Sequence, residues 1–337
     1  MIVKKIIFSE NGQTLDSKNI DNKNRIKGTL FGIAIGDALG VPVEFISRAD
    51  LKKRPVKEMI GHGTHNQSIG TWSDDSSLAF CLTEVITSEY DINKIAQNFI
   101  KWYYYSYWTA RGEVFDIGNS TKIAIERLVA GKKPELAGPV DENSNGNGSL
   151  MRIMPLLFCL YGMPVRKRFD MVKDVSSITH GHIRSVIACF YLLEFGSLIL
   201  EGFNKFEAYN ILKSNFSSVL LSFYVSDKEI SNLERLLNNN IYDIKENQIK
   251  SSGYVIDTLE ASIWSILTTN NFRDAVLKAV NLGNDADTTG AVTGGLAGLI
   301  YGFRDIPIEW VRSLAKNSEI NDLSERMYHR FSPRYAR

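Results

Sequence analysis

The stretch GNDADTTGAVTGGLAGLIYG, residues 283–302, decides the fold. Four of its glycines follow one another at intervals of four residues: Gly290, Gly294, Gly298 and Gly302. Residues four apart lie on one face of an α-helix. Because glycine inside a helix costs about 1 kcal/mol relative to alanine, this face requires a compensating close approach of another backbone. We therefore expect a helix packed tightly at the centre of a bundle.

A second glycine ladder lies near the beginning of the chain, again at intervals of four: Gly28, Gly32, Gly36 and Gly40. Chance is a weak explanation for two separate ladders of this kind. We expect both helices to be central, and their tight packing to hold the residues at their ends rigidly.

The rest of the chain also has helical spacing. Apolar residues recur with a helical period in ten segments: 76–89, 92–107, 119–130, 183–201, 206–214, 226–237, 254–268, 272–282, 288–302 and 307–316. No convincing alternating strand is present, and prolines fall at helix edges. The pattern predicts one compact all-α domain over residues 25–337.

Residues 1–24 differ from this domain. Ser9 to Asn24 is rich in Asn, Asp, Lys and Gln, whereas Ile2 to Phe8 could form a short strand. A polar arm of this kind buries little apolar surface. It is either a loosely docked terminus or an arm that contacts a partner.

The composition excludes several classes of protein. With 39 basic and 38 acidic residues among 337, the net charge of +1 does not favour nucleic-acid binding. Met1 to Phe8 lacks the features of a signal peptide, and no uninterrupted apolar run has membrane-spanning length. The odd number of cysteines, each in an apolar helical pattern, indicates buried thiols in a reducing compartment. We expect a cytoplasmic protein that binds neither nucleic acid nor membrane.

Two acidic motifs stand at predicted helix starts. Ser73-Asp74-Asp75 precedes one apolar helix, and Asp285-Ala-Asp287-Thr288 opens the helix of the first glycine ladder described above. Either motif alone is explained by ordinary helix capping. Together they bring hard oxygen ligands to two rigid helix ends, and a Mg²⁺ or Mn²⁺ ion would relieve the repulsion between the carboxylates. Since such an ion can activate water, the pattern predicts a metal-dependent hydrolase.

A glycine-rich turn adds a candidate anion site. Asn145 to Arg152 opens an apolar stretch, and free backbone N–H groups at such a turn suit a phosphate or diphosphate. The turn is neither a P-loop nor a dinucleotide-binding fingerprint. His62 and His65 lie in a loop before the first acidic motif, where we expect them only at the surface or anchoring the loop.

The chain resembles the ADP-ribosylglycohydrolases. The motifs that carry this resemblance occur in family order and span most of the chain: GTLFGIAIGDALGVPVEF (28–45), GTWSDDS (70–76), FDIGN (115–119), GNGSLMR (146–152), Thr179-His180 and GNDADTT (283–289). The pattern is nearest to the dinitrogen-reductase-activating glycohydrolase and to the bacterial immunity-type ADP-ribosylhydrolases.

The resemblance implies a single compact orthogonal multi-helix bundle with two Mg²⁺ or Mn²⁺ ions. The metal ligands that it implies are Ser73, Asp74, Asp75, Asp285, Asp287 and Thr288. It places Glu44 near the metals and gives Asp116 a catalytic role at the substrate ribose. The residues that it places in the ADP-ribose pocket are Gly118, Asn119, Asn147, Gly148 and His180. Ser73 replaces the family's usual threonine but keeps the hydroxyl, whereas Asn284 and Ala286 also depart from the motif.

The implied function is removal of ADP-ribose from a modified protein, with the N-glycosidic bond to arginine as the expected linkage. One alternative is a catalytically silent binding module, although all six ligand positions carry oxygen atoms. Another is an immunity or antitoxin protein that blocks an ADP-ribosyltransferase toxin through residues 1–24, with or without hydrolysis.

Overall fold

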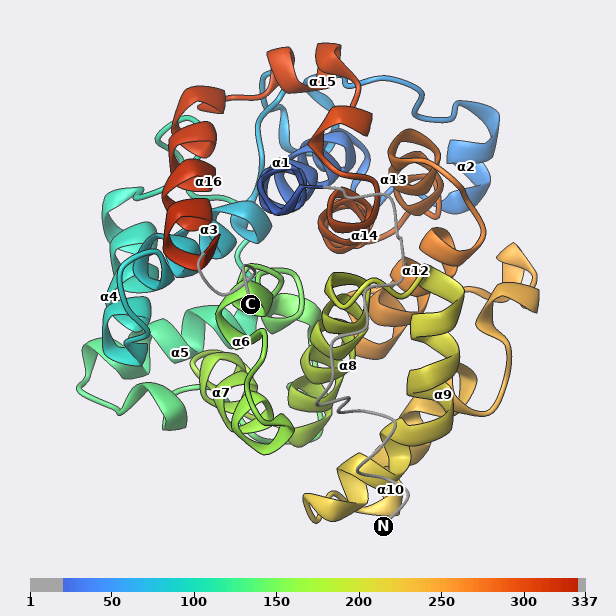
Figure 1. Ribbon diagram of the computed structural model, residues 1–337. Helices are drawn as coiled ribbons and strands as arrows, with labels where there is room; N and C mark the ends of the chain where they lie inside the picture. Colours follow the sequence, from blue (N-terminus) through green and yellow to red (C-terminus); the bar gives the residue numbers. More distant parts are fainter. Residues whose placement is uncertain (1–20, 333–337) are drawn as a thin grey trace.

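The computed structural model describes residues 21–332, and within this range it contains helices and two isolated β-bridges but no strand (Figure 1). The α-helices are α1 (Asn22–Gly40), α2 (Arg48–Lys53), α3 (Asp74–Ile86), α4 (Ile92–Tyr105), α5 (Asn119–Val129), α6 (Leu156–Leu160), α7 (Val165–Ser177), α8 (Ile183–Leu200), α9 (Lys205–Ser222), α10 (Asp227–Ile230), α11 (Glu234–Leu237), α12 (Val255–Leu267), α13 (Phe272–Val280), α14 (Ala286–Tyr301), α15 (Ile308–Ser313) and α16 (Asn317–Phe331). The predicted all-α class is confirmed.

The two glycine ladders face each other. Helices α1 and α14 run antiparallel, so that a Cβ atom added to Gly32 would overlap the carbonyl oxygen of Gly294, and one added to Gly36 would overlap that of Gly290. At the end of the interface, Gly40 lies against the backbone of Asp287. No side chain separates the two backbones along this line. The glycine ladders are therefore explained by the close approach of the two helix backbones, which only glycine permits because it has no Cβ atom.

The α1–α14 pair forms the centre of the bundle. Helices α3 and α16 pack against α1, whereas α12 and α13 pack against α14 (Figure 1). Nearly every residue of α1 from Gly28 onward is buried, including Asp37, and so is α14 up to Leu299. The N-terminus of α14 and the C-terminal end of α1 consequently lie together at one end of a buried helix pair.

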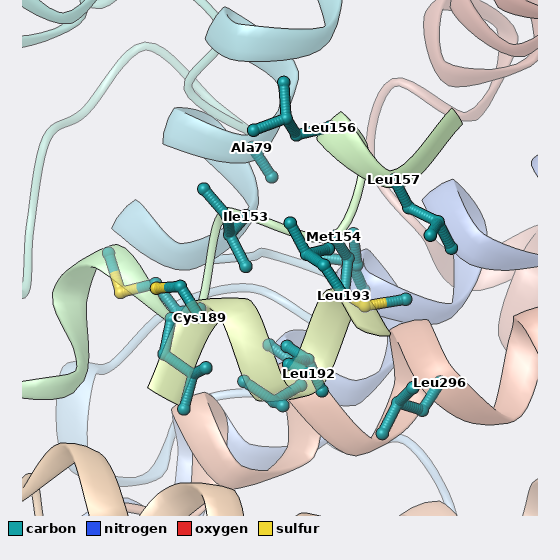
Figure 2. Close-up of a cluster of buried hydrophobic side chains, with 14 of the residues drawn as sticks. Ala79, Ile153, Met154, Leu156, Leu157, Cys189, Leu192, Leu193 and Leu296 are labelled. Atoms are coloured by element: carbon teal, nitrogen blue, oxygen red, sulfur yellow. The ribbon is translucent and has the colours of Figure 1, made fainter. Parts of the chain in front are cut away.

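A continuous apolar core surrounds this pair. Figure 2 shows part of it, where side chains from α3, α8 and α14 meet the segment 153–157 at the start of α6. Cys189 lies in this cluster, and Cys81 and Cys159 are buried as well, as predicted.

The segment boundaries differ from the predictions in several places. The helix predicted over 206–214 continues to Ser222, and the one predicted over 226–237 is broken into α10, a 3₁₀ turn and α11. Helices α2, α7 and α16 were not predicted. All three carry many charged residues, which obscure the helical periodicity of their apolar residues.

Two described helical segments, Asn22–Val43 and Ile183–Leu200, have the length and hydropathy of a membrane span. In the most apolar stretch of each segment, 94% of the first and 89% of the second is buried inside the protein. Their apolar composition is therefore explained by their place in the core. The first of them includes residues 22–24 of the predicted arm, which are helical; residues 1–20, with the possible short strand, lie outside the described residues.

Candidate active site

The first half of the site is the beginning of α14. Asp285 occupies the N-cap position, yet its side chain makes no capping hydrogen bond. Asp287 and Thr288 follow in the first turn, and the backbone N–H of Thr288 donates to Oδ1 of Asp287 at 2.9 Å. Capping therefore does not account for the Asp285 carboxylate, which points to a different use.

The second half is the beginning of α3. Ser73 is the N-cap residue, and its hydroxyl both accepts from the Asp75 N–H and donates to Oδ2 of Asp75 at 2.9 Å. Thr288 of the first half donates to the same carboxylate oxygen at 3.3 Å. The two helix starts, more than 200 residues apart in sequence, thus meet directly at Asp75.

Asp37 joins these halves and was not among the predicted site residues. Its Oδ1 accepts the backbone N–H of Ser73 at 2.9 Å, and its Oδ2 accepts both the N–H and the hydroxyl of Ser76. One oxygen from each of Asp37, Asp75 and Asp287 lies within 4.8 Å of the other two. A charged residue inside an otherwise apolar, glycine-spaced helix was the signal that could have revealed it.

Three carboxylate oxygens of this site are buried without a hydrogen-bond partner: Oδ1 of Asp75, Oδ1 of Asp285 and Oδ2 of Asp287. A buried acceptor without a donor is costly, and several such acceptors close together would be costlier still. Hard divalent cations bind this donor type. The residues present therefore fit a Mg²⁺ or Mn²⁺ site.

A second group of potential ligands shares Asp287 with the first. One ligand atom from each of Glu44, His65, Asp116 and Asp287 lies within 4.8 Å of all the others. His65 also forms a hydrogen bond through Nε2 to Oε2 of Glu44. His65 therefore belongs to the site, and the expectation that it only anchors a loop was wrong. The exposed His62 bonds to Asn66 within its own loop, as expected.

Crowding and burial shift the acid–base properties of this region. Burial raises the pKa of Asp37 to about 7. Burial and the charge of Asp116 raise the pKa of Glu44 to about 9. The pKa values of Asp74, Asp75 and Asp287 are raised well above the usual range, first by burial and then by neighbouring carboxylates. A bound cation would remove this conflict by favouring the ionised forms.

Asp116 lies in a strained segment at the edge of the site. Its φ of 61° is left-handed, a conformation that aspartate tolerates better than most residues. Burial raises its pKa, while His65 and a hydrogen bond with Asp287 oppose that shift. Gly118 and Asn119 follow at the start of α5, both exposed, and the space beside Gly118 is open.

The glycine-rich turn reaches the half of the site at the beginning of α14. Nδ2 of Asn147 donates to Oδ2 of Asp285 at 2.8 Å and to Thr258 at 2.9 Å. A Cβ on Gly148 would collide with the His180 ring, so this glycine allows the ring to close over the turn. Burial, together with the charge of Arg152, lowers the pKa of His180 to about 3, so the ring is neutral.

The structure brings most of the predicted residues together and adds Asp37 and His65. Glu44, Asp75, Asp116 and Asp287 belong to the two ligand groups, Ser73 and Thr288 bond to Asp75, and Asn147 bonds to Asp285. His180 lies against Gly148 in the same turn as Asn147, whereas Gly118 and Asn119 are exposed at the start of α5. Asp74 and Asp285 lie outside the two compact ligand groups, although the charge of Asp285 contributes to the raised pKa values of Glu44 and Asp74.

Comparisons with known proteins identify the family of this chain. The ADP-ribosylglycohydrolase family model matches residues 18–337. The ADP-ribosylarginine hydrolase Tri1 of Pseudomonas putida is 34% identical over 310 residues, which cover 91% of this chain and 78% of that protein. The ADP-ribosyl-[dinitrogen reductase] glycohydrolase of Rhodospirillum rubrum is 28% identical over 295 residues, which cover 86% of this chain and 90% of that protein.

This chain also superposes on a solved structure, an ADP-ribosylglycohydrolase-related protein complex, with a TM-score of 0.77 and 30% sequence identity. The superposition covers 91% of this chain and 98% of the chain in that structure. Sequence and fold thus lead to the same assignment, and the chain belongs to the ADP-ribosylglycohydrolase family.

Proposed function

We propose that this protein hydrolyses the N-glycosidic bond between ADP-ribose and an arginine side chain of a modified protein. The observation that carries the proposal is the set of buried, unpartnered carboxylate oxygens on Asp75, Asp285 and Asp287. The names of two similar proteins, the Tri1 hydrolases of Pseudomonas putida and Serratia proteamaculans, support arginine as the linkage.

The proposed cofactors are two Mg²⁺ or Mn²⁺ ions. The residues that would hold them are Ser73, Asp74, Asp75, Asp285, Asp287 and Thr288, with Asp37 added by its position among these carboxylates. Such ions, when bound, supply Lewis acidity and orient the hydroxyls of the ribose next to the protein.

Two carboxyl groups are placed for the proton transfers. Asp116 is the proposed general base, which accepts a proton from the water that attacks C1″ of the ribose. Glu44 is the proposed general acid for the leaving guanidine nitrogen, because one of its carboxyl oxygens lies within 4.8 Å of one from Asp116, so that both groups can reach the same glycosidic bond. His65, bonded to Glu44, would orient that carboxyl group.

The ADP portion of the substrate would lie along the glycine-rich turn. Asn147, Gly148 and His180 would form one wall, and Gly118 and Asn119 would contact the opposite end of the ligand. Because the His180 ring is neutral and buried, it would contribute shape and hydrogen bonding, not charge.

The alternative of an immunity protein acting through its arm receives no support from the comparisons, and residues 1–20 lie outside the described part of the chain. The proposed partner is an ADP-ribosylated protein, and the proposed compartment is the cytoplasm.

The test is an assay of free ADP-ribose released from arginine-linked and serine-linked ADP-ribosylated proteins, with Mg²⁺, with Mn²⁺ or with a chelator. We expect release from the arginine linkage that depends on the added ion. Full release in the presence of the chelator, or release from the serine linkage alone, would overturn the proposal.

A further inference from the structure

Phe45 has an unusual conformation beside the catalytic carboxyls. Its φ is 63°, in the left-handed region, which is a genuine outlier for a bulky side chain. Its ring is 68% exposed, although it directly follows the buried Glu44. An exposed ring adds little to stability, so packing does not explain why this residue is held there.

Backbone hydrogen bonds fix the loop on both sides of Phe45. Its N–H donates to the carbonyl of Asn284 at 2.6 Å, and the Asn284 N–H donates to the carbonyl of Ile46 at 2.8 Å. The hydroxyl of Thr64 donates to the carbonyl of Glu44 at 2.7 Å. Strain that the surroundings impose in this way is common at functional sites.

The Phe45 ring begins an aromatic rim around the carboxyls, made of Phe45, His65 and Phe115. The ring centroids of Phe45 and His65 are 6.1 Å apart, and those of His65 and Phe115 are 5.2 Å apart. Glu44 and Asp116 are each adjacent in sequence to one phenylalanine of the rim, and they belong to one ligand group with His65, the middle ring of the rim. An exposed aromatic face close to carboxyl groups suits a planar cation.

An open groove lies next to the segment that follows Phe45. It has a volume of about 520 Å³, and Arg48, Ala49 and Asn284 are among its lining residues. Asn284 is the residue whose backbone pairs with Phe45 and Ile46. The groove and Phe45 are thus connected through the backbone of Asn284.

We propose that Phe45 is a specificity-determining residue: the face of its ring receives the guanidinium group of the ADP-ribosylated arginine. This inference rests on the proposed function and deepens it. A guanidinium group gains both stacking and attraction to the ring quadrupole, whereas a neutral serine ether oxygen gains neither. The contact is absent from free ADP-ribose, which has lost the arginine.

The test compares Phe45→Ala, Phe45→Leu and Phe45→Trp with the wild-type protein in the presence of Mn²⁺, using ADP-ribosylarginine as substrate and free ADP-ribose as competitive inhibitor. We expect KM to rise about 3- to 30-fold for the alanine and leucine variants, while tryptophan restores it. Inhibition by ADP-ribose should stay within twofold. Tyr224→Ala is the matched control, since Tyr224 is also left-handed, with φ 62°, and 93% exposed, but lies after α9.

The outcomes separate the two proposals. A wild-type protein that does not hydrolyse ADP-ribosylarginine overturns the proposed function. If the wild-type protein is active, three results overturn the role of Phe45. KM is unchanged in Phe45→Ala, or Phe45→Leu has the same KM as the wild type. Alternatively, the affinity for free ADP-ribose falls in Phe45→Ala as much as KM rises. A fall in kcat at constant KM would also overturn it, because Phe45 would then only position Glu44.

Discussion

The side-chain amide of Asn147 donates a 2.8 Å hydrogen bond to Oδ2 of Asp285, and this bond connects the glycine-rich turn to the acidic start of α14. It occupies one oxygen of Asp285 and leaves Oδ1 without a partner. The orientation of a proposed metal ligand is therefore set by a residue of the proposed ADP-ribose pocket.

Asn147→Ala should weaken binding of Mn²⁺ by about 10- to 100-fold, because hydrogen bonds that orient metal ligands typically have effects of this size. Isothermal titration of the metal-stripped protein with Mn²⁺ would measure it. Asn143→Ala, at an exposed position of the preceding loop, is the control. Equal affinities for both variants would show that the amide does not orient Asp285.

Asp285→Ala should abolish both metal binding and hydrolysis while the helix content stays unchanged. The carboxylate makes no capping bond, so the helix loses no cap with it. Metal analysis and far-ultraviolet circular dichroism on the same sample would check this. Wild-type activity in this variant would refute the metal site.

Asp116→Asn should lower kcat by about 10²- to 10⁴-fold, the usual contribution of a general acid or base. The affinity for ADP-ribose should change much less, because the amide keeps the size of the side chain. Steady-state kinetics and calorimetry separate the two effects, with the exposed Asp141→Asn as control. Equal losses in rate and affinity would make Asp116 a binding residue.

The metal-free protein should lose stability as the pH rises from about 6 to 9.5. The folded pKa values of Asp37 and Glu44, about 7 and about 9, lie above those of the unfolded chain. The folded state therefore retains protons that the unfolded chain has released, and this contribution disappears as the pH passes through the folded values. Thermal melts should show the decline, and saturating Mg²⁺ or Mn²⁺ should largely remove it. A flat or rising melting temperature without metal would contradict the expectation.

Gly294→Ala should destabilise the protein, although alanine is the better helix former by about 1 kcal/mol. Its Cβ would overlap the backbone of Gly32, and a backbone in the centre of the core cannot move aside cheaply. Gly295→Ala is the control in the same helix, since its Cβ would meet the side chains of Ile33 and Met154, which can adjust. Chemical denaturation should give a lower unfolding free energy for Gly294→Ala than for Gly295→Ala.

The central helix pair and the two acidic motifs were predictable because their signals are local. A period of four glycines and a cluster of acids before an apolar run are visible in a window of twenty residues. Asp37 and His65 were not recognised, since each acquires its role through contacts with residues far away in sequence. The outward placement of Phe45 likewise depends on Asn284, almost 240 positions later, and no local pattern predicts it.

The facing ladders make the geometry of the proposed metal site depend on the register of two helices. Asp37 belongs to one helix and Asp287 to the other, so a slip of one residue would displace one against the other by about 1.5 Å, far beyond the tolerance of a coordination sphere. Gly298 lies about 16 Å along α14 from Asp287. A substitution at Gly298 can therefore abolish activity or change the preferred ion without altering any atom that touches the substrate. Inactive variants from a random screen should be compared with the positions of the ladder before their loss of activity is attributed to a catalytic residue.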